Sequence, residues 1–133
     1  MDGTHETIEQ PMFQTKADAL RFRTRQFALA VIRLCESLPK RQSAQVIGHQ
    51  LLRSATSVGA HYREACRARS TAEFISKVDV ALQELDETMY WLELLLDSGC
   101  AGKEVITPLM IEANELCSIL SSSSKTAKSS KKM

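Results

Sequence analysis

Residues 51–96 constrain the fold of this chain more than any other stretch, because they predict two long helices separated by a very short turn. Apolar or small residues recur every three or four positions on both sides of the turn, as in helices with one face in a core. The turn is Arg69-Ser70-Thr71, and Ser70 with Glu73 forms the S-x-x-E capping box that opens a new helix. Two long helices joined so closely fold back on each other as an antiparallel hairpin.

The apolar stripes of this hairpin indicate which helix faces enter a core. The first helix is expected to begin near Ser43, which can act as an N-cap, and the second to end at Gly99, a C′ glycine. The small residues Gly59 and Ala60 would let another helix backbone approach the first helix closely. The stripe of the first helix consists of Ile47, Leu51, Ala55, Val58, Tyr62 and Cys66, and that of the second consists of Phe74, Val78, Ala81, Leu85, Met89, Leu92 and Leu96.

A further helix is predicted before the hairpin. Thr15 and Asp18 form a capping box in which the threonine accepts a first-turn N–H and the aspartate reaches back. Apolar residues then follow with helical spacing until Pro39, which cannot continue a helix. We therefore predict a helix over residues 16–38.

The last helix and the two ends of the chain complete the division of the sequence. Thr107 and Pro108 have the residue types of an N-cap and a first helical position, so a helix is predicted over residues 107–121. Residues 1–14 are expected to form a flexible arm. Residues 122–133 are expected to form a disordered Lys/Ser tail, because this segment offers almost no apolar side chain for packing.

Composition and length limit the class of protein. The 133 residues suit a single domain, and only five Gly and three Pro favour long helices. With no strand signal, residues 15–121 are predicted to be an all-α, antiparallel up-down-up-down four-helix bundle. No signal peptide and no membrane-spanning apolar run is found, so we expect a cytoplasmic protein. The cysteines form no CxxC pair and are expected to be reduced and partly buried: they are Cys35, Cys66, Cys100 and Cys117.

Sorting the charges by helix separates a basic region from an acidic one. The first hairpin helix carries arginines on the side opposite its core stripe, whereas the second is rich in carboxylates. Because a guanidinium fork binds phosphate or carboxylate, the arginine face could contact nucleic acid or pair with a neighbouring subunit. A third interpretation is that it is only a solvated face of the helix. The candidate nucleic-acid contacts, including lysines of the C-terminal tail, are Arg53, Arg63, Arg67, Arg21, Arg25, Lys128, Lys131 and Lys132.

The second hairpin helix also has a second apolar line, formed by Val80, Trp91 and Leu94. Glu84 and Glu87 flank this line, and their carboxylates could meet the arginine face of a neighbouring subunit. We predict a subunit interface at these five residues, because an exposed apolar line of this kind is unusual on a monomer. Contact between two different surfaces is head-to-tail and closes as a ring. In the alternative interpretation, Trp91 packs within its own subunit under the loop that follows this helix.

The sequence contains no arrangement of residues typical of an enzyme. His49 and His61 lie about 120° apart around their helix and cannot bind one metal together. Glu84 and Glu87 share a side, but the Glu-x-x-His motifs of di-metal bundles are absent. Cys66 has arginine neighbours that could activate a thiol, although a structural role is favoured. We therefore expect no catalytic residues, metal or cofactor, and rank a metal- or thiol-dependent enzyme last.

A block of the hairpin carries a resemblance to a known family. The matching residues are Leu52, Arg53, Ser54, Ala55, Ser57, Val58, Gly59, Tyr62, Arg63, Glu64, Ala65, Arg67, Ala68, Ser70, Phe74, Ile75, Lys77, Ala81, Glu84, Glu87, Thr88, Tyr90, Trp91 and Leu92. With these residues the chain resembles the 23S rRNA-intervening-sequence proteins, which are bacterial four-helix bundles, and the likeness extends more weakly over about residues 20–121. The family usually has Asn where this chain has His61.

The resemblance implies a ring-shaped homopentamer of antiparallel bundles. It also implies a relationship to accessory proteins of diversity-generating retroelements, which are basic, bind nucleic acid and engage a reverse transcriptase. Members found within rRNA intervening sequences have no established activity, and no catalytic residues carry over. The favoured hypothesis is a non-enzymatic, ring-forming bundle that binds RNA or DNA electrostatically, with a nucleic-acid-processing protein as a further partner. The second hypothesis is a protein-interaction scaffold whose arginines serve subunit assembly.

Overall fold

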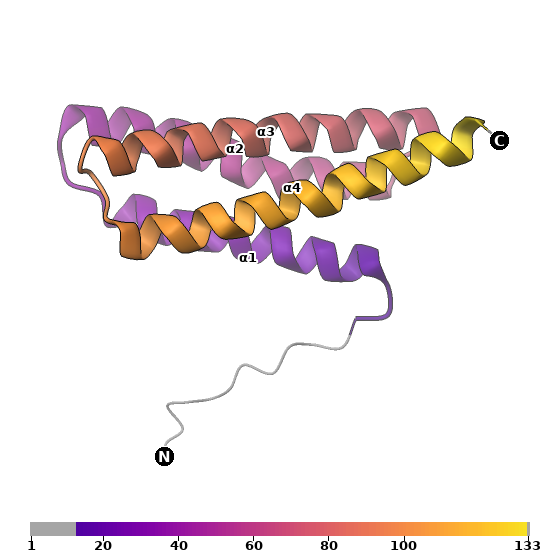
Figure 1. Cartoon of the computed structure of the whole chain (residues 1–133), viewed down its shortest axis with the longest axis horizontal. Coiled ribbons are helices and arrows are strands. Elements are labelled where there is room, and N and C mark those ends of the chain that lie inside the picture. Colours follow the sequence, from indigo (N-terminus) through magenta and orange to yellow (C-terminus); the bar gives the residue numbers. More distant parts are fainter. Residues whose placement is uncertain (1–12, 133) are drawn as a thin grey trace, which may run out of the picture.

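The computed structural model describes residues 13–132, with side chains described up to residue 130 (Figure 1). No strand occurs within this part of the chain, so the prediction of an all-α four-helix protein is confirmed. The expected arm over residues 1–14 lies, apart from its last two residues, outside the described part. The four helices are α1 (Lys16–Glu36), α2 (Gln42–Cys66), α3 (Thr71–Asp97) and α4 (Lys103–Lys132).

Each helix packs against the next in the chain, and α4 also contacts α1 (Figure 1). α2 and α3 run in opposite directions, because Ser54 contacts Thr88 near their middle and Glu64 contacts Lys77 nearer the turn. α1 and α4 share the smallest contact among neighbouring helices and diverge towards Lys16 and the C-terminal end of α4 (Figure 1). The bundle is therefore most tightly packed around the α2–α3 pair.

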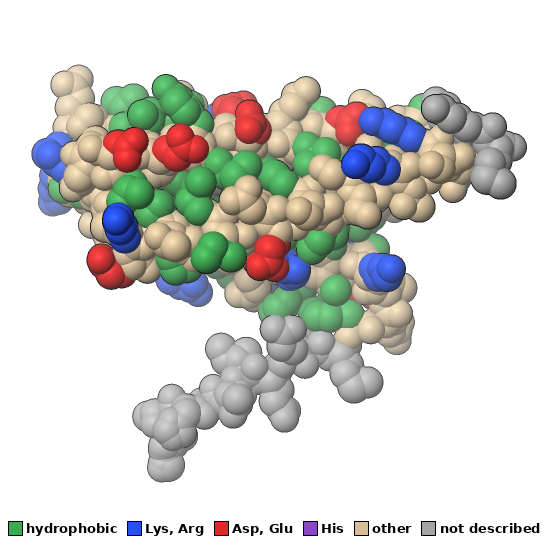
Figure 2. Space-filling view, viewed as in Figure 1, with side chains coloured by type: hydrophobic (Ala, Val, Ile, Leu, Met, Phe, Trp, Pro, Cys, Tyr) green, Lys and Arg blue, Asp and Glu red, His purple; other side chains and the backbone are tan. Residues whose placement is uncertain are grey.

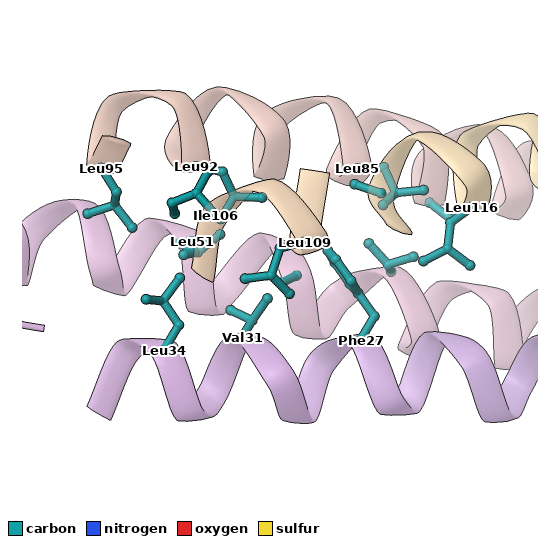
Figure 3. Packing of buried hydrophobic residues seen from close by; sticks show 14 of the residues in the cluster. Phe27, Val31, Leu34, Leu51, Leu85, Leu92, Leu95, Ile106, Leu109 and Leu116 are labelled. Carbon is teal, nitrogen blue, oxygen red and sulfur yellow. The ribbon is translucent and has the colours of Figure 1, made fainter. Parts of the chain in front are cut away.

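A single hydrophobic core runs between all four helices (Figure 3). Thr88 and Leu95 are buried, whereas the predicted Met89 and Leu96 are half-buried, so the core face of α3 is turned slightly from its expected position. Each fully buried leucine contributes roughly 1.5–3 kcal/mol relative to an exposed one. The predicted stripe residues that are buried are Leu51, Ala55, Val58 and Tyr62 in α2, and Val78, Ala81, Leu85 and Leu92 in α3.

The predicted side-chain caps of α1 and α3 are present. The Ser70 hydroxyl accepts the N–H of Glu73 at 3.0 Å, and the Glu73 carboxylate accepts a backbone N–H ahead of the helix at 3.2 Å. At α1, the Thr15 hydroxyl accepts the N–H of Asp18 at 3.0 Å. The Asp18 carboxylate pairs with Arg21 instead of reaching back to the cap. Both helices thus begin where local side chains satisfy first-turn amides.

The predicted end of α3 at Gly99 is confirmed by the backbone. Gly99 has a φ of 76°, in the left-handed region that glycine adopts without a Cβ penalty. The N–H of Cys100 bonds to the carbonyl of Leu95 at 2.9 Å, and the N–H of Gly99 bonds to that of Leu96 at 3.1 Å. These two bonds form a Schellman motif, which ends α3 and turns the chain towards α4.

Two helix boundaries near the first turn differ from the prediction. α2 begins at Gln42, so the assignment of Ser43 as its N-cap is wrong, and the actual cap position makes no side-chain hydrogen bond. The N–H of Gln45 bonds to the carbonyl of Arg41 at 3.0 Å, so the first helical turn already includes Gln42. α1 ends at Glu36 instead of residue 38, because Pro39 disfavours helical geometry in the residues before it.

The start of α4 also lies earlier than predicted. α4 begins at Lys103, so the prediction that Thr107 caps this helix is wrong. Ile106 is buried at 1% exposure and belongs to the apolar face of α4, which requires the helix to begin before it. The carbonyl of Gly102 accepts the N–H of Ile106 at 3.0 Å, and Pro108 therefore lies inside the helix.

The C-terminal segment is helical. α4 continues to Lys132, so the prediction of a disordered tail over residues 122–133 is wrong for the described part. Ser124 is only 3% exposed, and its hydroxyl donates to Oδ1 of Asp79 in α3 at 3.1 Å. The Nζ of Lys128 lies 3.9 Å from Oδ2 of the same aspartate. The tail packs with few apolar residues because a small polar side chain can be buried once it has an acceptor.

Candidate nucleic-acid interface

Arg53, the first candidate arginine, is paired with carboxylates of its own chain. Its Nη1 lies 3.3 Å from Oε1 of Glu84, and its Nη2 lies 2.5 Å from Oε1 of Glu87. From the sequence, these glutamates could have met the arginine face of a neighbouring subunit. The structure instead places the contact between α2 and α3 within one chain. Charge-assisted bonds of this kind are stronger than neutral ones.

The contact of Arg53 is part of a larger group of charges across α2 and α3. The side chain of Glu84 is 13% exposed, and its second oxygen lies 3.8 Å from Nε2 of His61. The Nδ1 of His61 lies 3.3 Å from Glu64, which also pairs with Lys77 at 3.1 Å. Lys77 and His61 lower the pKa of Glu64. The α2–α3 charge cluster consists of Arg53, His61, Glu64, Lys77, Glu84 and Glu87.

The α2–α3 charge cluster could have been predicted from the sequence by using the register that the short turn sets. In an antiparallel hairpin with a short turn, residues at similar distances from the turn lie side by side. Glu64 and Lys77 are close to the turn on either side, and Arg53 and Glu87 are about equally far from it. Counting outward from the turn therefore predicts contact within one chain, which helical spacing alone does not.

Arg23 makes the second paired set, between α1 and α4. Its Nε and Nη2 contact the two oxygens of Glu112 at 3.0 and 2.6 Å, and Nη2 also contacts Glu115 at 2.8 Å. The hydrogen bonds to Glu112 and Glu115 raise the pKa of Arg23 above its ordinary value. This bidentate contact links α1 and α4, which share the smallest contact among neighbouring helices. Sequence analysis did not find it, because no short turn sets the register of α1 against α4.

A different arrangement occurs on the outer side of α1 and α2, where three arginines surround a hollow of about 300 Å³. Arg25 and Arg63 are exposed, and neither makes an ion pair with any carboxylate among the described side chains. Arg21 is half-buried and pairs with Asp18; the Cys66 thiol and this carboxylate raise its pKa. We call this hollow the arginine groove, and its lining consists of Arg21, Thr24, Arg25, Ala28, Thr56, Gly59, Ala60 and Arg63.

The arginine groove exists because α1 and α2 approach closely at one glycine. A Cβ added to Gly59 would lie 3.1 Å from Oγ1 of Thr24, which is tighter than ordinary contact. Thr24 is itself buried at 1% exposure and forms part of the packed interface between the helices. The expectation that Gly59 allows close helix packing is therefore confirmed. This packing brings arginines of α1 and α2 to the same groove.

The remaining candidate side chains are dispersed. Arg67 is exposed at the C-cap of α2, beyond the lining of the arginine groove. Lys128 lies near Asp79, while the side chains of Lys131 and Lys132 fall outside the described part. Figure 2 shows the face with α3 and α4 in front, where carboxylates follow α3 and basic side chains gather towards the C-terminal end of α4. The structure therefore joins Arg21, Arg25 and Arg63 and separates them from Arg53.

Comparison with known proteins identifies the family. The sequence model of the family described as 23S rRNA-intervening sequence protein matches residues 20–122. The chain belongs to this family. A solved structure described as a protein of unknown function from the S23 ribosomal protein family of Bacteroides thetaiotaomicron is 36% identical, with a TM-score of 0.78. It covers 84% of this chain and 99% of its own. No curated protein matches the chain.

In this family member the second apolar line of α3 is more buried than the sequence suggested. Val80, Trp91 and Leu94 are each half-buried, and Trp91 packs against the core of its own chain. The indole Nε1 of Trp91 is buried and has no hydrogen-bond partner among the described residues. Tyr90, which the sequence analysis did not select as an interface residue, is 53% exposed, and its ring centroid lies 5.0 Å from that of Trp91. The outward face of α3 thus presents Tyr90 more than Trp91.

Other kinds of site would need clustered metal ligands, a reactive thiol or a membrane-spanning helix. Among the described residues, no group of three His, Cys, Asp or Glu side chains is placed to hold a metal ion. All four cysteines are free, and burial raises the pKa of Cys35 to about 11 and also raises that of Cys117. In the described part of the chain, none of the helices combines the length and apolar character needed to cross a membrane.

Proposed function

We propose that the protein is a non-enzymatic, oligomeric four-helix bundle of the cytoplasm that binds RNA or DNA electrostatically. The observation that supports this is the difference between its arginines. Arg23 and Arg53 have carboxylate partners, whereas Arg25 and Arg63 have none among the described side chains. An arginine without a carboxylate partner is available for phosphate, which its planar fork matches in geometry.

The binding would come from several basic side chains acting together. Arg21, Arg25 and Arg63 line one groove, and Arg67 follows on the same helix as Arg63. Each phosphate that such a side chain neutralises releases a counterion, so affinity would fall steeply as salt rises. A net formal charge of only +1 on the whole chain keeps long-range attraction small, and the proposed affinity is therefore weak.

The oligomeric part of the proposal concerns the outward face of α3. We propose that the subunit contact lies around Val80, Glu84, Glu87, Trp91 and Leu94, and we add Tyr90 to this proposal because its side chain is exposed. An exposed aromatic ring beside half-buried apolar residues suits a protein interface. The family resemblance implies a homopentameric ring, and a nucleic-acid-processing protein is the further partner that we propose.

A second candidate function is a protein-interaction scaffold with no nucleic-acid role. It is favoured by the α2–α3 charge cluster, in which Arg53 is already occupied by carboxylates. Glu87 is 47% exposed, so this cluster could extend to a basic residue of a neighbouring subunit. In that case the exposed arginines would serve assembly, and an intact ring would not bind nucleic acid.

A binding titration with structured RNA and duplex DNA tests the proposal, at low and moderate salt, with the oligomer mass followed by light scattering. Deleting residues after 121 would remove the buried Ser124, so the tail is tested with Lys125→Gln and Lys128→Gln instead. Salt-dependent binding that survives these changes supports the proposal. Binding lost with the two lysines moves the site to α4, and an intact oligomer without binding supports the scaffold.

A further inference from the structure

The composition of the arginine groove limits what kind of polyanion fits it. Its lining contains three arginines, two threonines, two alanines and one glycine, and no aromatic, carboxylate or amide side chain. We infer that the groove holds the sugar-phosphate backbone of a nucleic-acid duplex, which it contacts through phosphates without reading the bases. This inference rests on the proposed nucleic-acid binding and names the form of nucleic acid and the groove that binds it.

The hydrogen-bond donors of the groove are its guanidinium groups. The Thr56 hydroxyl donates to the carbonyl of Leu52 at 2.7 Å, and the Thr24 hydroxyl donates to that of Arg21 at 3.1 Å. Both threonine protons are therefore already used within the helices. Arg25 and Arg63 face the groove from different helices, so a phosphate between them can receive a fork from each side. The site thus offers forked, charged donors, which suit the anionic oxygens of a phosphate.

The floor of the groove allows a phosphate to come close. Ala28, Gly59 and Ala60 have little or no side chain, so the guanidinium groups stand above a shallow floor. The hollow of about 300 Å³ is lined by residues 21–28 of α1 and 56–63 of α2, about two turns of each helix, which suits a strand backbone that passes along it. The helices cannot adjust their separation freely, because Gly59 and Thr24 are already in close contact. The backbones that carry Arg25 and Arg63 are therefore held close together, so both side chains can reach the same stretch of a ligand backbone.

The absence of an aromatic side chain from this lining argues against a single strand. Proteins that bind single strands without sequence preference stack the bases on aromatic rings beside a basic groove. The exposed aromatic residue Tyr90 is on α3, and α3 does not line the arginine groove. A duplex keeps its bases stacked on one another and presents one charge per about 1.7 Å of its axis, so it needs no ring from the protein.

The test compares a short RNA duplex with one of its strands alone, an unstructured sequence, over a range of salt concentrations with full-length protein. The groove variants are Arg25→Gln and Arg63→Gln, singly and together. Arg33→Gln is the matched control, since Arg33 is an exposed arginine of α1 outside the groove. We expect tighter binding of the duplex than of the strand. Each groove substitution should reduce the slope of log affinity against log salt by about 0.9, and Arg33→Gln should leave it nearly unchanged.

Each other outcome overturns the inference in a distinguishable way. Equal or tighter binding of the single strand would show that the duplex assignment is wrong while the proposed function stands. Duplex binding that Arg25→Gln and Arg63→Gln do not weaken would place the site elsewhere on the bundle, again without harm to the proposed function. No binding of either nucleic acid at low salt would remove the proposed function and this inference together. Circular dichroism of each variant separates these outcomes from misfolding.

Discussion

The α2–α3 charge cluster and the arginine groove use arginines from the same helix, yet their arginines have different partners. Arg53 of α2 faces the acidic helix α3 and pairs with Glu84 and Glu87. Arg63 of α2 lines the same groove as Arg21 and Arg25 of α1, and no carboxylate lines that groove. The charge of a helix therefore does not decide the role of its arginines. The neighbouring helix on each side decides whether an arginine stabilises the fold or remains available to a ligand.

The largest expected difference between the two regions comes from reversing the charges of the arginine groove. With Arg25→Glu and Arg63→Glu together, we expect duplex affinity to fall about a hundredfold or more at moderate salt, because two phosphate contacts become repulsions. Both side chains are exposed, so the melting temperature should change little. Fluorescence anisotropy and thermal unfolding measure the two quantities. A loss no larger than that of Arg33→Glu would contradict the assignment.

The opposite change converts the paired arginine into an unpaired one. Glu84→Gln with Glu87→Gln removes the carboxylates that Arg53 contacts, and we expect the free energy of unfolding to fall by about 1–3 kcal/mol. Most of this effect should come from Glu84, whose side chain is 13% exposed and lies between Arg53 and His61. Duplex affinity should rise several-fold as Arg53 becomes available. Urea unfolding and anisotropy check both expectations. Lower stability with unchanged affinity would show that the carboxylates are not what keeps Arg53 from binding the duplex.

The close approach of α1 and α2 offers a packing test of the same comparison. Gly59→Leu places a side chain where a Cβ alone would lie 3.1 Å from Thr24, so we expect α1 to be displaced and the free energy of unfolding to fall by about 1–2 kcal/mol. Duplex affinity should fall as well. His49→Leu is the control, because His49 is an exposed residue of α2 that does not line the arginine groove. Equal effects of the two substitutions would mean that the close approach does not form the groove.

The smallest expected effect concerns the pH dependence of the α2–α3 charge cluster. Lys77 and His61 hold the pKa of Glu64 below its ordinary value of 4.5. The Glu64 carboxylate therefore stabilises the fold above that pH, and the contribution is lost as the pH falls through the lowered pKa. Glu64→Gln should make the loss of stability in acid less steep, by a small amount because the pair is exposed. Urea unfolding over the acid range measures this loss of stability, with Glu104→Gln as an exposed control. The same pH dependence in Glu64→Gln and in the unsubstituted protein would contradict the prediction.

Sequence reasoning recovered the features that local residues determine. The caps at Thr15 and Ser70 and the end of α3 at Gly99 each depend on side chains or backbone within a few positions, so their signals are complete in the sequence. The core stripes of α2 and α3 followed from helical spacing, with small errors in rotation. Four helices in one all-α fold were therefore predictable.

The errors arose where contacts between helices decide the outcome. Ser124 is buried because Asp79 of another helix accepts its hydrogen bond, and no local pattern in the tail shows that. Arg53 and Arg63 looked equivalent on a helical projection, because spacing gives the face of a helix but not the helix that lies beside it. The role of each arginine therefore required the register of the α2–α3 hairpin and the position of α1.

The division of the arginine groove between two helices has a thermodynamic consequence. Because Arg25 belongs to α1 and Arg63 to α2, the groove is complete only while α1 is docked against α2. A polyanion that occupies it binds the docked state and not the undocked or unfolded one, so by linkage it raises the apparent stability with its free concentration. Nucleic acid would then stabilise the docked position of α1, the helix that has little contact with α4. Hydrogen exchange in α1 would report its occupancy.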